Sequence, residues 1–190
     1  MRIIGGKWRG TSLSSVGKGD AANHLRPTTD RVRESVFNVL QGGRFGDPVF
    51  NARVLDLFAG TGALGLEALS RGAAYAAFVD DGRIASRLLQ DNFKKLGIVE
   101  QISQLQLDAT RLRDNPESGF DLVFVDPPYG KNLGTPTLLN AAKRGWFAEA
   151  ALIVWEESAP QVAPQGFEML DVRRYGDTHI SFLRRSRSKG

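Results

Sequence analysis

The residues best suited to chemistry stand where an apolar run at 122–125 ends in Asp126, Pro127, Pro128 and Tyr129. Prolines donate no hydrogen bond to a β-ladder and keep the preceding residue extended, so the chain must leave a sheet at this point. The carboxylate of Asp126 and the carbonyl of Pro127 could accept the two hydrogens of an amino group and localise its lone pair. The ring of Tyr129 could stack on a planar base. A proline-rich turn after a core strand is the alternative interpretation.

Asp-Pro-Pro-Tyr in this setting resembles the motif of methyltransferases that alkylate exocyclic amino groups of nucleobases. A second motif suits the cofactor of such an enzyme. After a predicted strand at 54–58, Gly60, Gly62 and Gly65 form a turn that lets the backbone approach a ligand at the start of a helix. The same spacing fits a nicotinamide cofactor. Asp56 favours S-adenosylmethionine, because in the methyltransferase type of turn that acid supports the loop and the methionine part of the cofactor.

Two further acids follow predicted strands. Asp80 comes after a strand at 75–79, about twenty residues beyond the glycines, where an acid can accept hydrogen bonds from both ribose hydroxyls. Its neighbour Asp81 is the alternative for this role. Asp108 follows the next strand and stands, with Ala109, where an adenine amino group would be held. The alternative interpretation of Asp108 is a cap for the next helix.

Helical and strand periodicity alternate along the chain, which predicts an α/β fold. A first helix is expected after a cap at Thr29 or Asp30 and ends at Gly42, with its charged residues, Arg33 among them, away from the core. A loop at 131–135 could cover the site. Further helices are predicted at 63–71, 84–96 (with Ile84 on its buried side) and 138–146, and strands at 54–58, 75–79, 102–107, 121–125, 151–155, 167–175 and 179–184.

These elements predict a three-layer sandwich around a Rossmann-like, mostly parallel seven-stranded sheet. The last two strands form a hairpin through 176–178 and supply one antiparallel strand. The expected organisation is a basic N-terminal arm or hairpin with its loop at 1–25, a methyltransferase domain at 26–185, and a disordered basic tail at 186–190.

Composition narrows the function classes. The 190 residues carry a net charge of +4, and the excess lies at the two ends, which suggests a polyanionic partner, nucleic acid first, although solubility alone would also explain it. The absence of cysteine rules out disulfides and thiolate chemistry, and two histidines make a metal site unexpected. No apolar run is long enough to span a bilayer, so no membrane association and a cytoplasmic location are expected.

Candidate contacts to RNA lie in the basic N-terminal part of the chain. They are Lys7, Trp8, Arg9, Arg26 and Arg31. A tryptophan between two cations could stack on nucleic acid or lie on a phosphate backbone. It could equally pin the arm to the core.

Several segments together resemble the bacterial 16S ribosomal RNA guanine-N2 methyltransferase family; these are 5–10, 26–40, 54–73, 120–129 and 175–178. The resemblance implies S-adenosylmethionine as cofactor and the guanine at position 966 as target, within a partly or fully assembled small ribosomal subunit. A monomer is expected. An adenine-N6 methyltransferase acting on DNA or RNA is the alternative within enzymes. A nicotinamide-dependent oxidoreductase and a nucleic-acid-binding module without catalysis are the alternatives from other classes.

Overall fold

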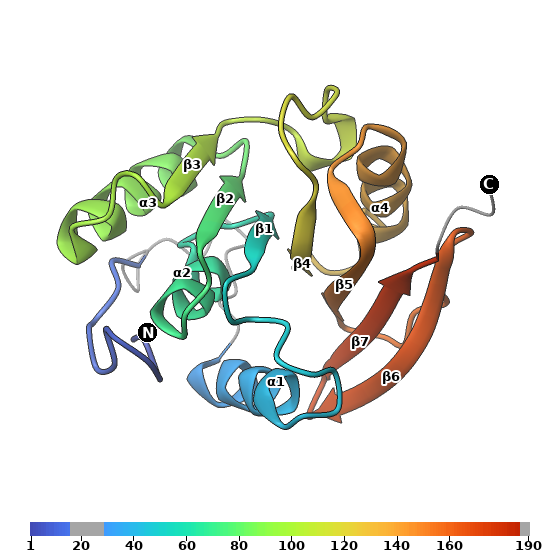
Figure 1. Ribbon diagram of the computed structural model, residues 1–190, viewed down its shortest axis with the longest axis horizontal. Helices are drawn as coiled ribbons and strands as arrows, with labels where there is room; N and C mark the ends of the chain where they lie inside the picture. The colour runs from blue at the N-terminus through green and yellow to red at the C-terminus, as the bar shows by residue number, and fades with distance from the viewer. Residues whose placement is uncertain (16–28, 187–190) are drawn as a thin grey trace.

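The computed structural model describes residues 1–15 and 29–186 and contains one seven-stranded sheet in the order β3-β2-β1-β4-β5-β7-β6 (Figure 1). Strands β1 to β5 pair in parallel, and β7 runs antiparallel to both β5 and β6. The predicted fold class, with a single antiparallel strand, is therefore confirmed. The strands are β1 Arg53–Leu57, β2 Tyr75–Val79, β3 Ile102–Leu105, β4 Phe120–Val125, β5 Phe147–Glu157, β6 Phe167–Tyr175 and β7 Thr178–Arg185.

Helices cover both faces of the sheet and complete the three layers. Helices α1 (Asp30–Gln41), α2 (Ala63–Ser70) and α3 (Arg83–Leu96) pack in one apolar cluster with the strand residues Val54 and Phe124. Helix α4 (Gly134–Lys143) and the short 3-10 helix η1 (Ala109–Arg111) pack in a second cluster with residues that point to the other face. The alternation follows from the two-residue period of a strand buried on both sides. In the described parts of the chain, no helix is both long and apolar enough to cross a bilayer.

The register of the parallel strands decides where the chemistry lies. Leu57 pairs with Val79 on one side and with Val125 on the other, so β1, β2 and β4 end level with one another. The residues that follow, Asp80 after β2 and Asp126 after β4, therefore leave the sheet at the same carboxyl edge. The amide of Asp126 still reaches back to the carbonyl of Leu57 at 3.4 Å.

The N-terminal arm is a hairpin fastened to α2. Its two halves meet in an antiparallel bridge between Arg2 and Ser12, so of the two expected forms, arm and hairpin, the structure shows the hairpin. The amides of Ile4 and Gly5 each donate to the carboxylate of Glu67 at 2.8 Å. Trp8 packs, partly buried, against the larger apolar cluster, so the structure favours its role in pinning the arm to the core.

The prediction that Arg33 lies among solvated charges is wrong. Its side chain is fully buried, where Nη2 donates to Asp30 at 3.0 Å and to the carbonyl of Arg2. Its Nε lies 3.7 Å from the equally buried carboxylate of Glu67. Burying one charge without a partner would be costly, and the pair at the base of the arm explains how both are tolerated.

Several predicted boundaries shift. Helix α4 begins at Gly134, so the expected loop at 131–135 is shorter, and Ile84 on α3 is exposed rather than buried. Strand β5 is longer at both ends than predicted, because it pairs with β7 as well as β4. The domain limits near residue 25 and at residue 186 stay predictions, since 16–28 and 187–190 lie outside the described residues.

Candidate active site

The glycine-rich turn after β1 has an unusual backbone. Gly60 and Gly62 have φ values of 54° and 78°, in the left-handed region that glycine adopts at little cost. Phe58, immediately before them, has φ 61°, which is uncommon for a bulky side chain and tends to occur at functional sites. Sequence reasoning placed Phe58 in the strand, because nothing in its type signals this conformation.

Asp56 lies beneath the turn and is 1% exposed. Its Oδ2 accepts a hydrogen bond from the amide of Gly65 at 2.9 Å, at the start of α2. Burial raises the pKa of Asp56 to about 8; the Gly65 amide opposes this rise and the nearby charge of Asp80 adds to it. Gly65 itself has to be glycine, because a Cβ there would lie 2.5 Å from the ring of Phe78. The predicted role of Asp56 in supporting the loop agrees with this geometry.

Asp80 ties the turn to the end of β2. Its Oδ2 accepts from the amide of Gly60 and its Oδ1 from the amide of Gly82, both at 2.8 Å. Partial burial raises the pKa of Asp80 despite these two hydrogen bonds. A carboxylate oxygen has a second lone pair, so the clamp leaves Asp80 able to accept from ribose hydroxyls. Asp81 is exposed next to it, and the choice between the two acids stays a prediction.

Asp108 caps η1, as its alternative interpretation predicted. Its Oδ1 accepts from the amide and the hydroxyl of Thr110 at 2.8 and 2.7 Å. The hydroxyl hydrogen bond is the main reason that the pKa of Asp108 lies below its usual range. Ala109 follows it and is buried. A role for these two residues at the adenine stays a prediction.

The Asp-Pro-Pro-Tyr motif leaves the sheet between β1 and β5. Asp126 is half-buried and Pro127 is buried. The hydroxyl of Tyr129 donates to Oε1 of Glu156 at 2.6 Å and lies 3.2 Å from Oγ1 of Thr178. Burial, reinforced by the hydrogen bond to Glu156, raises the pKa of Tyr129, so its hydroxyl stays protonated. Sequence reasoning missed Glu156 and Thr178 as partners of the motif.

The candidate RNA contacts are distributed over two elements. Lys7 and Arg9 are exposed on the N-terminal hairpin, and Nζ of Lys7 lies 5.1 Å from the centre of the Trp8 ring. Arg31 is exposed on α1. Arg26 lies outside the described residues. The contacts of all five with RNA stay predictions.

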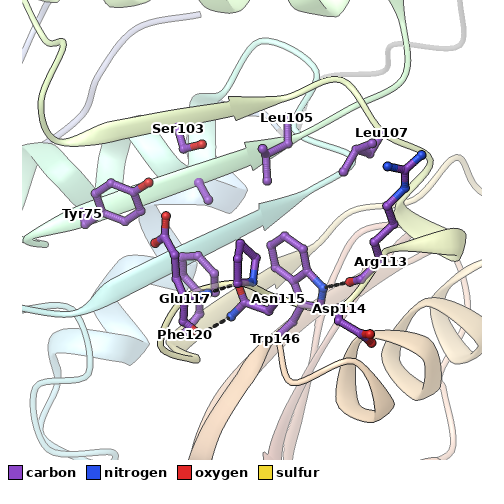
Figure 2. Close-up of a pocket in the computed structure, with 12 residues that line it drawn as sticks. Tyr75, Ser103, Leu105, Leu107, Arg113, Asp114, Asn115, Glu117, Phe120 and Trp146 are labelled. Carbon is purple, nitrogen blue, oxygen red and sulfur yellow. Dashed lines mark hydrogen bonds between the residues drawn. The ribbon is translucent and has the colours of Figure 1, made fainter.

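A separate pocket of about 200 Å³ opens on the sheet face that carries η1. Figure 2 shows the rings of Tyr75, Phe120 and Trp146 along it, with the loop at 113–117 closing one side. Trp146 donates from its indole nitrogen to the carbonyl of Arg113 at 2.7 Å. Tyr75 and Phe120 are the first residues of their strands, so this end of the pocket lies away from the edge that carries Asp80 and Asp126.

Comparison with known proteins adds to this geometry. A family model described as conserved hypothetical protein 95 matches residues 1–184. The chain belongs to this family.

Relatives of this family member carry methyltransferase names. The chain is 39% identical over 166 residues to the ribosomal RNA small subunit methyltransferase D of Escherichia coli, covering 86% of this chain and 78% of that protein. It is 34% identical over 182 residues to the Haemophilus influenzae protein of the same name, covering 93% and 89%. A solved Escherichia coli structure, titled as the putative methyltransferase YhhF, has a TM-score of 0.83 at 34% identity over 99% of both chains.

The residues of this family member suit S-adenosylmethionine. Two carboxylates, Asp56 and Asp80, lie close enough for the charge of one to raise the pKa of the other, which is an arrangement that a cation relieves. S-adenosylmethionine is such a cation, because it carries a sulfonium and an ammonium group. The left-handed glycines at 60 and 62 keep the turn beside these acids free of side chains. The donor set therefore fits the cofactor that the fold implies.

Proposed function

We propose that the chain transfers a methyl group from S-adenosylmethionine to the exocyclic N2 amine of a guanine in 16S ribosomal RNA, at position 966. One observation carries the proposal above the others. The register of β1, β2 and β4 brings the acid-flanked glycine turn and Asp126 to one edge of the sheet. A methyl donor and an amino acceptor can meet only if their binding groups share such an edge.

The chain's own residues act by position and charge. S-adenosylmethionine, when bound, supplies an electrophilic methyl group. Asp126 and the Pro127 carbonyl accept hydrogen bonds from the amine, which localises the nitrogen lone pair and aims it for attack. The proton released by the amine then leaves to Asp126 or to water. Tyr129 stacks on the base and sets its plane. This division of labour needs neither a covalent intermediate nor a metal ion.

The identity of the substrate is supported by charge and by relatives. Two curated relatives above 30% identity are named as methyltransferases of the small-subunit ribosomal RNA. The hairpin at the edge of this chain exposes Lys7 and Arg9, and α1 exposes Arg31, as a phosphate backbone requires. The small subunit, as free or assembling particle, is therefore the substrate proposed, with the protein acting as a monomer in the cytoplasm.

The test compares three acceptors in parallel. Purified protein is incubated with methyl-labelled S-adenosylmethionine and small subunits lacking the modification, naked 16S ribosomal RNA, or DNA. Nucleoside analysis should recover N2-methylguanosine from the subunits. Label in N6-methyladenine, or label in DNA alone, would show that the base or the nucleic acid is wrongly assigned. The Asp126→Ala variant serves as the inactive control.

A further inference from the structure

The hydroxyl of Tyr129 is held by residues from two strands that follow it far along the chain. Glu156 belongs to β5 and Thr178 begins β7, respectively 27 and 49 residues along the chain from the tyrosine. The Glu156 hydrogen bond is 2.6 Å long, within the range of a hydroxyl donating to a charged carboxylate. The motif loop is therefore fastened to the C-terminal part of the sheet through the phenol oxygen.

Glu156 is a buried acid near the end of β5. It is 6% exposed and follows five buried residues of β5, from Ala151 to Trp155. A carboxylate in such a place loses hydration and is tolerated only with hydrogen-bond partners. The Tyr129 hydroxyl is one such partner, and its hydrogen bond joins this buried acid directly to the motif.

The backbone beside Tyr129 gives the ring little support. Gly130 has φ 70° and Asn132 has φ 53°, so the chain turns sharply straight after the tyrosine. The side chain is only half-buried. A ring attached to such a turn can tilt about two side-chain bonds unless its far end is restrained. The contact at the phenol oxygen supplies that restraint.

Resting on the function proposed above, we infer that Glu156, together with Thr178, is a positioning residue for methyl transfer. It holds the Tyr129 hydroxyl and thereby sets the plane in which the target base stacks beside Asp126. Small displacements of a reacting group can cost about a hundredfold in rate, so a loosened ring should lower kcat. Cofactor affinity should not change, because Asp56 and Asp80 hold the glycine turn independently of Glu156.

The experiment measures kcat, the KM for small subunits and the Kd for S-adenosylmethionine in a set of variants. Glu156→Ala should lower kcat about tenfold with an unchanged Kd. Tyr129→Phe should lower kcat at least as much, because it removes both the hydrogen bond to Glu156 and the contact with Thr178. Glu156→Gln retains an oxygen acceptor and should keep activity within about threefold of wild type. The double variant Tyr129→Phe/Glu156→Ala should be no slower than Tyr129→Phe alone, because the hydrogen bond to Glu156 is already lost in that variant.

The matched control is Glu157→Ala. Glu157 is also a buried acid of β5, but it accepts from Ser158 at 2.8 Å instead of from Tyr129, so its loss should leave kcat unchanged. Additive losses in the double variant, or wild-type kcat in Glu156→Ala, would overturn the positioning role. If the wild-type protein methylates no form of the small subunit, the proposed function fails and this inference fails with it. If Glu156→Ala does not fold, the paired comparison of Glu156→Gln with Tyr129→Phe decides the question.

Discussion

The two halves of the site share one sheet edge but are held there by different kinds of contact. On the cofactor side, the amides of Gly60 and Gly65 donate to Asp80 and Asp56, so the backbone itself is fixed. On the substrate side, the last residue of the motif is held through its side chain, by Glu156. The cofactor side is thus a turn whose backbone is fixed by two acids, and the substrate side is a loop held by the side chain of a residue on another strand.

The range of these contacts along the chain also differs. The cofactor-side hydrogen bonds join residues 9 and 20 positions apart, whereas the tyrosine is held from 27 and 49 positions away. The acids that hold the cofactor turn thus lie close to it along the chain, whereas the motif tyrosine is held by β5 and β7, which follow it. Substitutions on the two sides should consequently separate methyl transfer from cofactor binding.

The largest expected effect is on the substrate side. Asp126→Ala removes the carboxylate that we assign to the target amine, and turnover should fall by about a hundredfold or more, as for loss of a group aimed at a reacting centre. The Kd for S-adenosylmethionine should change little, because the acids of the glycine turn remain. Single-turnover methylation and calorimetric titration measure the two quantities separately.

A control at the opposite end of the same strand isolates this effect. Asp121 is exposed near the start of β4, where its carboxylate accepts from the amide of Arg53 at 2.9 Å. Asp121→Ala should keep near-wild-type turnover. If Asp126→Ala retained more than about a tenth of the wild-type rate, the assigned role of Asp126 would be wrong.

The two halves of the site also differ in how many of their contacts could be predicted from the sequence. The mostly parallel sheet and the carboxyl-edge placement of Asp80 and Asp126 follow from alternating periodicities and from the rule that ligand-binding residues follow the carboxyl ends of parallel strands. Support of the loop by Asp56 was expected from the resemblance to the methyltransferase type of turn, whereas its hydrogen bond to Gly65 became known only from the structure. The roles of these residues toward cofactor and base stay predictions.

Contacts between side chains far apart in the sequence could not be predicted. Glu156 could not be assigned to Tyr129, because an acid at a strand end is equally consistent with a solvated residue or a cap. Arg33 was misplaced for the same reason, since its partner Glu67 lies on another helix. The left-handed conformation of Phe58 comes from the tight turn that follows, and no residue preference for φ > 0 indicates it.

The cofactor side should respond to pH in a way that the substrate side does not. Since the pKa of Asp56 is about 8 in the free protein, the carboxyl is mostly protonated at neutral pH. A cationic ligand favours the ionised form, so cofactor binding lowers this pKa and releases a proton. The contribution of Asp56 to the affinity for S-adenosylmethionine should rise by up to about tenfold per pH unit below pH 8 and be complete above it, where deprotonation of the ligand's own amino group acts in the opposite direction.

Asp56→Asn is the matched variant for this titration. It retains an oxygen that can accept from Gly65 but cannot ionise, so only the titration of the ligand's own amino group remains. The measurement is the Kd for S-adenosylmethionine by calorimetry from about pH 6 to 9, in buffers of different ionisation enthalpy to count released protons. Identical slopes for the two proteins would contradict the assignment to Asp56.

A smaller effect should arise where the N-terminal hairpin meets the cofactor turn. The fully buried Asn92 on α3 donates to the carbonyl of Thr61 at 2.9 Å and accepts from the amide of Ser14 at 2.7 Å. Asn92 also donates to the carbonyl of Ser14 at 3.3 Å, so Asn92→Ala takes this partner from three backbone groups, at a cost of about 1–3 kcal/mol. We expect the Kd for S-adenosylmethionine to rise about fivefold while kcat at saturating cofactor stays unchanged.

The exposed neighbour Asp91 provides the comparison for that variant, because Asp91→Ala alters the same helix without touching the turn. Its cofactor affinity should match wild type. A loss of kcat in Asn92→Ala at saturating cofactor would show that the two halves of the site are less independent than their contacts suggest.

The smallest effect is expected at the outer surface of the hairpin, which should serve RNA affinity and neither half of the chemistry. Lys7 and Arg9 are exposed and project from an arm that Glu67 fastens to α2. Replacing either with alanine should weaken small-subunit binding by only a few-fold and lower the slope of log affinity against log salt by about one. Binding measured between about 50 and 200 mM salt resolves this slope, with Glu34→Ala as an exposed control of opposite charge. The kcat at saturating subunit should stay constant, because neither cation lies at the carboxyl edge of the sheet. If both variants keep the wild-type salt slope, the hairpin does not contact the RNA.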